Sequence, residues 1–258
     1  MSNYHLEIKN ICRGKGGSVA HAVSYACGKK VHDCYRNMDY RNSRNDILYS
    51  KIYLPSNAPP ELNDLQTLCN EIEKAETRYN ARSARVFIGS LPNELSTEEL
   101  INIVQEFVFE NFTSQGLCSI AAIHEGKNKS DPTKNNPHVH IIVSTRTVEA
   151  TGFNKKKDRE HNNKKYIFFW REAWAKVQNR AYERNCLNIR VSHESLEVQG
   201  KLDREPVPHL SQRDWQKEQR GERTAAGDRK RAIQKRNKEK ALKRQREQER
   251  SLEMELSR

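Results

Sequence analysis

Three histidines at the ends of two apolar segments are the residues whose spacing most clearly predicts chemistry. His138 and His140 alternate with apolar residues in NPHVHIIVS, and alternate residues of a strand point to one face. His124 ends the preceding apolar run, so a hairpin pairing of the two strands would bring its imidazole beside the other two. Three neutral imidazoles can hold a divalent cation and leave coordination positions open for a substrate oxygen. The alternative is that these histidines lie on a solvated strand face.

A tyrosine in a short helix after a glycine-rich turn is the candidate nucleophile. Tyr25 lies in GKGGSVAHAVSYACGKK, where Ser18 can cap a helix through Val19–Tyr25. A phenol, with an ordinary pKa of about 10, attacks poorly unless it loses its proton or its charge is stabilised, and a metal can contribute to both. A phosphorus atom bound at that metal is a suitable electrophile. The alternative is that Tyr25 packs in the core beside Val19 and Val23.

Acidic residues of a helix expected at 61–82 are candidates for supporting the histidines. Glu73 and Glu76 are three apart and therefore share a helix face. A carboxylate there could accept the second ring N–H of a metal-bound histidine. The alternative, which the spacing alone favours, is a solvated face that pairs with Lys74 and Arg78.

The elements that must position these residues mix strands and helices without a repeated strand–helix–strand order. Strands are expected at 4–11, 47–54, 83–91, 118–124, 139–145 and 189–192. Helices are expected at 19–25, 61–82, 97–112 and 168–184, with a loop leading to about residue 46. The pattern predicts an α+β domain in which helices cover one face of an antiparallel or mixed sheet.

The charge distribution indicates an anionic partner and a separate tail. Lys and Arg number 46 against 34 Asp and Glu, and residues 213–258 contain sixteen of the former and nine of the latter. We therefore expect a folded domain over 1–210 and a basic, charged helical tail over 211–258. Phosphates of a nucleic acid would select such a charge, although an anionic membrane or an acidic protein would also do so. The chain lacks an apolar run of the ~20 residues that a membrane span needs and begins without a secretory signal, which predicts a cytoplasmic protein with no membrane insertion.

Several blocks of the sequence together resemble the MobA/MobL family of plasmid-mobilisation relaxases, within the HUH class of nucleases. In order, these blocks are RGKGGSVAHAVSYACGKK, LPSNAP, NEIEKAETRYNARSARVFIGSLPNEL, AAIHEG, NPHVHIIVSTR and SHESLEVQGKLDREPVPHL. The resemblance covers roughly residues 1–210. It implies a fold like that of HUH relaxases and Rep proteins, an antiparallel sheet with helices packed on it.

The resemblance also implies an activity and roles for residues. A relaxase is a site- and strand-specific endonuclease that nicks single-stranded DNA at a plasmid origin of transfer for conjugative mobilisation. Tyr25 would attack the scissile phosphodiester, leaving a 5′-phosphotyrosine and a free 3′-hydroxyl. The three histidines would hold Mg²⁺ or Mn²⁺, and the supporting acidic position falls on Glu73 or Glu76.

The partners implied are origin-of-transfer DNA, single-stranded at the nick and duplex beside it, a type IV secretion coupling protein and accessory mobilisation proteins. The tail could follow the flanking duplex or dock on the secretion machinery, and the alternative is that its charges are only solvated. Contacts to the DNA backbone are expected from basic residues, namely Arg13, Lys15, Lys155, Lys156, Lys157, Lys164 and Lys165. For Arg13 and Lys15, the alternative is a plain solvated charge.

Two other functions compete with this interpretation. A rolling-circle replication initiator would use the same tyrosine and metal chemistry, but such initiators usually place the tyrosine after the HxH motif, whereas Tyr25 precedes it. In a non-catalytic basic DNA-binding protein, the histidines would be structural.

Overall fold

The computed structural model describes residues 4–128, 131 and 135–256. The chain divides into two units, Met1–His193 and Glu194–Arg258. This division precedes the expected boundary at residue 210 because the segment before it is tied to the last helix: Glu205 pairs with Arg236 at 2.6 Å.

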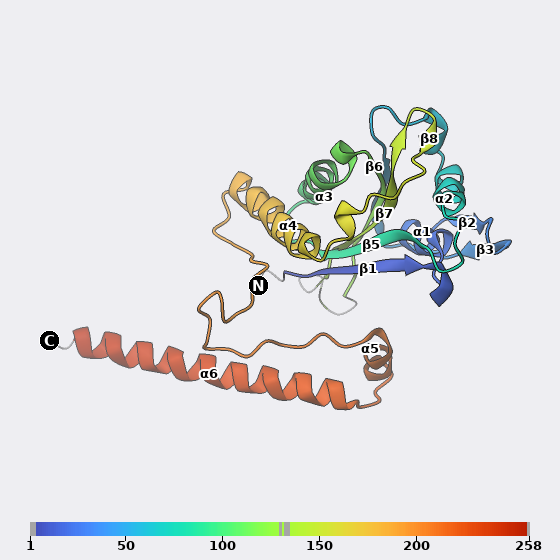
Figure 1. Ribbon diagram of the computed structural model, residues 1–258. Helices are drawn as coiled ribbons and strands as arrows, with labels where there is room; N and C mark the ends of the chain where they lie inside the picture. Colours follow the sequence, from blue (N-terminus) through green and yellow to red (C-terminus); the bar gives the residue numbers. More distant parts are fainter. Residues whose placement is uncertain (1–3, 129–130, 132–134, 257–258) are drawn as a thin grey trace. The chain divides into compact units, whose positions relative to one another are not determined.

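An antiparallel sheet forms the centre of the first unit (Figure 1). Its main path runs β1-β5-β7-β6-β4, with β8 paired to the end of β7. The strands are β1 (Leu6–Cys12), β4 (Ile47–Tyr53), β5 (Arg82–Ser90), β6 (Leu117–His124), β7 (His138–Glu149) and β8 (Gly152–Phe153). The predicted α+β class with an antiparallel sheet is confirmed.

Helices cover both faces of this sheet, so the prediction of a single covered face is wrong (Figure 1). The helices are α3 (Thr97–Asn111) and α4 (Lys165–Arg184) on one face, and α1 (Val19–Cys27) and α2 (Leu65–Lys74) on the other.

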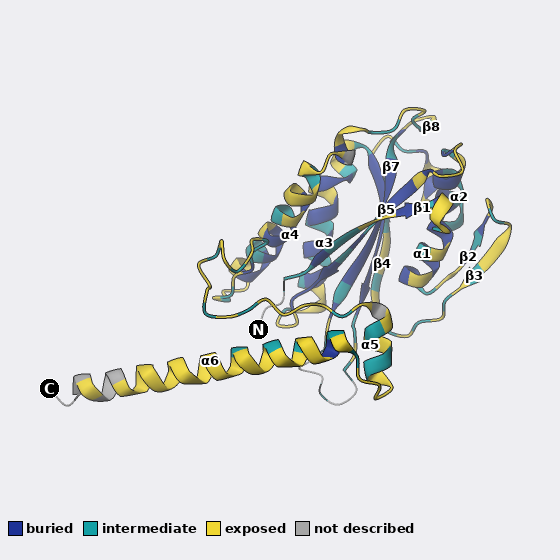
Figure 2. Cartoon of the chain, turned by 60° about the horizontal axis from the view of Figure 1, so that its bottom comes forward, coloured by how far each residue is buried: buried dark blue, intermediate teal, exposed yellow. Residues whose placement is uncertain are grey.

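The residues of the central strands explain why helices cover the second face of the sheet. Ile141 packs into the cluster beneath α3 and α4, whereas Ile142 packs into the cluster beneath α1 and α2. Figure 2 shows most of β5 and β7 as buried. A strand with apolar side chains on both faces must be covered on both.

Specific residues define the start and the end of α1. Ser18 caps its start by accepting the His21 N–H through Oγ at 3.0 Å, as expected from the sequence. Gly28 ends it in the left-handed conformation (φ 64°) and donates its N–H to the Ser24 carbonyl. A Cβ at position 28 would lie 2.7 Å from Ile47 Cδ1, so the helix end packs closely against β4.

The expected loop to residue 46 contains a hairpin of β2 (Lys30–Asp33) and β3 (Met38–Arg41). Its turn forms because Asp33 Oδ1 accepts the backbone N–H groups of Tyr35 and Arg36, both at 3.0 Å. The segment has little apolar alternation, so a loop was predicted. The signal that this prediction missed is the turn-forming Asp33.

Two other elements differ from their predicted extents. Helix α2 ends at Lys74 rather than continuing to 82, because the next carbonyls turn inward to accept the Arg13 guanidinium, that of Glu76 at 2.9 Å. The segment 189–192 is not a strand. There Val191 bonds through its backbone N–H and C=O to the Asn179 side chain, at 2.9 Å each.

The second unit consists of α5 (Gln212–Gln219), the long α6 (Ala225–Leu256) and the segment before them. Most of α6 is exposed (Figure 2). Ion pairs hold it within the unit, including Arg231 to Glu218, and Arg236 and Lys240 to Glu205. Across the described part of the chain, no helix combines the length and the apolar character needed to cross a membrane.

We expect Phe107→Ala to lower the free energy of unfolding by about 3–5 kcal/mol, because it empties a fully buried site. The Phe107 ring contacts those of Phe87, Phe112 and Trp174. Phe109→Ala is the matched control on the same helix, since Phe109 is 63% exposed and should change stability by less than about 0.5 kcal/mol. Urea denaturation measures both; equal effects would contradict this view of the core.

Candidate functional site

The pairing of β6 with β7 brings the three predicted histidines together. His124 lies opposite His138, and His140 lies opposite Ala122 on the face covered by α1 and α2. The ring centroids are 5.2 Å apart for His124 and His138, 4.7 Å for His124 and His140, and 5.2 Å for His138 and His140. One nitrogen from each ring lies within 4.8 Å of the others, so a single cation could contact all three.

The hydrogen bonds of these rings fit a cation site. His124 donates through Nε2 to the Ala26 carbonyl at 2.7 Å, and His138 donates through Nδ1 to the Asn136 carbonyl at 2.8 Å. Among the described residues, the buried nitrogens His124 Nδ1 and His140 Nε2 have no hydrogen-bond partner. Such buried polar atoms cost free energy, and a bound cation would satisfy them. For His124 and His138, backbone carbonyls take the orienting role that the resemblance implied for Glu73 or Glu76.

The electrostatics keep the imidazoles neutral, which is the form that binds metals. Burial lowers the pKa of His124 to about 4 and that of His140 to about 3. Burial lowers the pKa of His138 as well. The positive charge of Arg44 contributes to all three shifts, and the negative charge of Asp46 opposes them.

Tyr25 lies beside these rings on α1. Its ring centroid is 5.5 Å from that of His140 and 6.1 Å from that of His124, edge-on in both cases. The residue is 39% exposed, whereas Val19 and Val23 of the same helix are fully buried. The alternative of a core tyrosine is therefore excluded, and the phenol is accessible next to the candidate cation site.

Arg44 and Asp46 belong to the same site but were not predicted. The Arg44 guanidinium carbon lies 4.8 Å from the Tyr25 ring centroid. Arg44 donates to Asp46 through Nε at 2.9 Å and Nη2 at 2.6 Å. The pairing of β4 with β6, which sets Ile47 opposite His124, brings this segment to the site. That long-range pairing leaves no local signal in the sequence.

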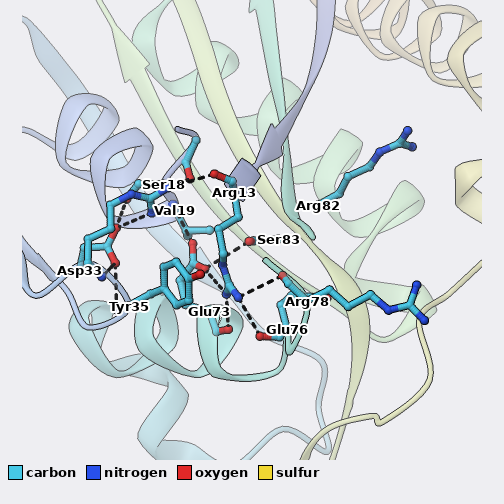
Figure 3. A network of polar contacts seen from close by, with 12 residues as sticks. Arg13, Ser18, Val19, Asp33, Tyr35, Glu73, Glu76, Arg78, Arg82 and Ser83 are labelled. Atoms are coloured by element: carbon cyan, nitrogen blue, oxygen red, sulfur yellow. Dashed lines mark hydrogen bonds and ion pairs between the residues drawn. The ribbon is translucent and has the colours of Figure 1, made fainter. Parts of the chain in front are cut away.

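The structure places Glu73 away from the role expected for it (Figure 3). Its carboxylate accepts Arg13 Nη2 at 2.6 Å, Ser83 Oγ at 3.2 Å and the Val19 N–H at 3.2 Å. The side chains of Glu73 and Arg13 are only 2% and 3% exposed. Glu73 thus supports the start of α1, where the helix dipole favours a negative charge, and indirectly the tyrosine on that helix.

Glu76 is likewise buried and paired elsewhere. It accepts Arg146 Nε at 2.9 Å and lies 3.0 Å from Lys157 Nζ. Within the contacts of the described chain, neither Glu76 nor Glu73 bonds to a histidine. The solvated-face alternative fails as well: the exposed pair on this helix is Glu71 with Lys74.

The predicted phosphate-binding residues divide into two groups. Arg13 is buried in its ion pair, and Lys157 is engaged by Glu76 and the Arg82 carbonyl. Neither side chain is therefore free to contact DNA, contrary to the prediction. The other five are exposed on the first unit: Lys15, Lys155, Lys156, Lys164 and Lys165.

Comparison with known proteins identifies similar chains. The model of the MobA/MobL family matches residues 17–220. A probable mobilization protein MobA of Bifidobacterium longum is 29% identical over 252 residues, covering 81% of this chain and 43% of that protein. Mobilization protein A of Escherichia coli is 26% identical over 245 residues, covering 88% and 32%. The chain therefore spans less than half the length of these two relatives.

Solved structures resemble the fold. One, described under "Molecular Basis of Vancomycin Resistance Transfer in Staphylococcus aureus", has a TM-score of 0.67 and 28% identity, and the likeness covers 75% of this chain and 100% of that chain. The conjugative relaxase TrwC, in a metal-bound complex with oriT DNA, has a TM-score of 0.50 and 13% identity, covering 91% of this chain and 98% of that chain. The second likeness shows a shared fold alone.

We expect Glu73→Gln to lower the free energy of unfolding by about 3–5 kcal/mol, because it leaves the buried Arg13 charge without its partner. Glu71→Gln is the matched control on the same helix, and its exposed pair with Lys74 should contribute less than about 1 kcal/mol. Urea denaturation measures both. A Glu73→Gln protein as stable as the control would refute the supporting role of this carboxylate.

The buried imidazoles predict a pH dependence of stability in metal-free protein. The histidines of the unfolded chain have a pKa of about 6.5, so the lowered values in the fold stabilise it fully above that pH and progressively less below it. In EDTA, the free energy of unfolding should therefore fall between about pH 7 and pH 5, above the range of ordinary carboxylates. His140→Gln should reduce this fall, and His21→Gln, at an exposed site, should not. Urea denaturation between pH 5 and pH 7 measures the free energy of unfolding of the parent and both variants. The same pH dependence in His140→Gln as in the parent would refute the prediction.

Proposed function

Because the chain belongs to the MobA/MobL family, we propose that its first unit is a DNA relaxase domain that nicks one strand at a plasmid origin of transfer. The observation that carries the proposal is the position of Tyr25, whose exposed phenol lies beside a cluster of imidazoles able to hold one cation. Two relatives described as mobilisation proteins, and a shared fold with a relaxase bound to oriT DNA, support it.

The three histidines would hold the divalent cation, Mg²⁺ or Mn²⁺, which neutralises charge on a non-bridging oxygen of the scissile phosphate. Hydrogen bonds from His124 and His138 to backbone carbonyls fix those two rings before metal binds. Burial lowers the pKa of His124 and of His138, so protons compete less with the cation for the ring nitrogens.

Tyr25 would supply the nucleophile. A bond forms between its phenol oxygen and phosphorus while the bond from phosphorus to the 3′ oxygen breaks. The tyrosine hydroxyl loses a proton, and the departing 3′ oxygen takes the electron pair and gains a proton. One phosphoester replaces another, so no ATP is consumed, and attack by a 3′-hydroxyl on the phosphotyrosine can reseal a strand. The edge-on packing of the phenol against His124 and His140 limits the orientations from which it attacks.

The DNA would be held mainly through its backbone and through stacking of unpaired bases. The five exposed lysines named above can neutralise phosphates. Phe168, 66% exposed near the start of α4, offers a stacking surface for single-stranded DNA. Flanking duplex DNA, a type IV secretion coupling protein, accessory mobilisation proteins and action in the cytoplasm follow from the family, and we include them in the proposal.

Tyr25→Phe should abolish nicking of supercoiled origin DNA and the covalent protein–oligonucleotide adduct, because it removes the attacking oxygen. Tyr79→Phe is the control, since Tyr79 is 75% exposed and should form the adduct as the parent does. Denaturing gels quantify the adduct, and mass spectrometry of the parent identifies the modified residue.

EDTA should stop the parent reaction, and Mn²⁺ should restore it. An adduct on another tyrosine, or nicking by Tyr25→Phe at the parent rate, would contradict the proposal. Preference for transfer-origin over replication-origin sequences separates a relaxase from a replication initiator.

A further inference from the structure

We propose that Arg44 binds the scissile phosphate directly, with Asp46 holding its guanidinium in place. This inference rests on the proposed function, because it assigns a second cation to the same reaction. A phosphoryl group attacked by a phenol has two non-bridging oxygens, and its charge is stabilised best when each has a fixed partner. The histidine-bound cation can serve one of them, and Arg44 would serve the other.

The first support is placement beside both reacting groups. The Arg44 guanidinium carbon lies 4.8 Å from the Tyr25 ring centroid, and that ring lies 5.5 Å from His140. A phosphate bound between the tyrosine and the cation site would therefore lie close to this guanidinium.

The second support is the way Asp46 binds Arg44. Two parallel hydrogen bonds, from Nε at 2.9 Å and Nη2 at 2.6 Å, engage one edge of the guanidinium. A guanidinium has five N–H donors in a fixed plane, of which Asp46 engages two. Hydrogen bonds with Asp46 and with the Tyr25 phenol raise the pKa of Arg44. The two side chains are 20% and 18% exposed. One edge is thus anchored, and donors remain on a partly desolvated group, which suits a charge-assisted bond to phosphate.

The third support is the attachment of this segment to both elements of the site. The Asp46 carbonyl accepts the Glu125 N–H at 2.8 Å, directly after His124 on β6. On the other side, a Cβ at Gly28 would lie only 3.4 Å from Arg44 Cβ, so the segment packs on the end of the helix that carries Tyr25. Arg44 is therefore held at a fixed position relative to Tyr25 and to the imidazoles.

Two other arginines with little exposed surface, Arg13 and Arg146, differ from Arg44 in what they contact. Arg13 is 5% exposed, and its guanidinium bonds to Glu73 and to backbone carbonyls. Arg146 bonds to Glu76 and to the carbonyls of Asn154 and Lys155. Their donors are engaged by carboxylates and backbone carbonyls, whereas Arg44 lies over the ring of the candidate nucleophile.

The test compares Arg44→Ala and Arg44→Lys with Arg41→Ala, a control at an exposed arginine of the neighbouring strand β3. Adduct formation is measured under single-turnover conditions with Mn²⁺ and a single-stranded origin oligonucleotide, and affinity is measured with a non-cleavable oligonucleotide. Arg44→Ala should slow adduct formation by about 100-fold and weaken affinity by less than about threefold, while Arg44→Lys should retain part of the rate. Arg41→Ala should match the parent.

Stereospecific phosphorothioates separate phosphate binding from a structural ion pair. Sulfur at the oxygen that Arg44 contacts should slow the parent, and this slowing should persist with a thiophilic metal such as Cd²⁺. In the lysine and alanine variants that slowing should largely disappear, while the slowing from sulfur at the other oxygen should remain. A purely structural Arg44 would leave both effects intact in the folded variants.

The proposal is overturned if Arg44→Ala forms the adduct within about threefold of the parent, if rate and affinity fall equally, or if both phosphorothioate effects survive the substitution. Failure of the proposed function is distinct, because then Tyr25→Phe itself would still form the adduct. Loss of the adduct in Tyr25→Phe with an unaffected Arg44→Ala would reject only the role of Arg44.

Discussion

His124 lies directly across from His138 in the pairing of β6 with β7, and the rest of the site depends on that register. Side chains alternate between the two faces of a strand, so His138 and His140 face α1 while Val139 enters the opposite apolar layer. A slip of one residue would exchange them, placing imidazoles among the side chains beneath α3 and α4. Because both layers are apolar and closely packed, each face of the sheet opposes such a slip.

A second requirement is that α1 be held against those strands at both ends. At its start, the Glu73 carboxylate joins the Val19 amide to the buried Arg13, and at its end Gly28 packs against Ile47. Burying an ion pair carries a desolvation cost that can exceed the attraction between the charges, so stability alone does not account for it. Here the pair fixes the position of a helix of nine residues.

The parts of the site that local patterns specify were predictable. Alternation around His138 and the run ending at His124 indicated strands, and Ser18 marked the start of the tyrosine helix. Partners distant in the sequence were not predictable: Glu73 meets Arg13 across 60 positions, and the Arg44 segment reaches the site through the pairing of β4 with β6. The continuous apolar runs of β6 and β7 did contain a signal for a sheet covered on both faces, which the strand assignment alone did not use.

The position of Tyr25 on a short helix has a mechanical consequence. In the proposed reaction, a DNA strand joined to Tyr25 would transmit any tension along it into α1. The force would then pass to the Arg13–Glu73 bond at one end of the helix and to the contact of Gly28 with β4 at the other. The buried network of Figure 3 would thus resist detachment of the helix while the strand is pulled, in addition to its part in folding.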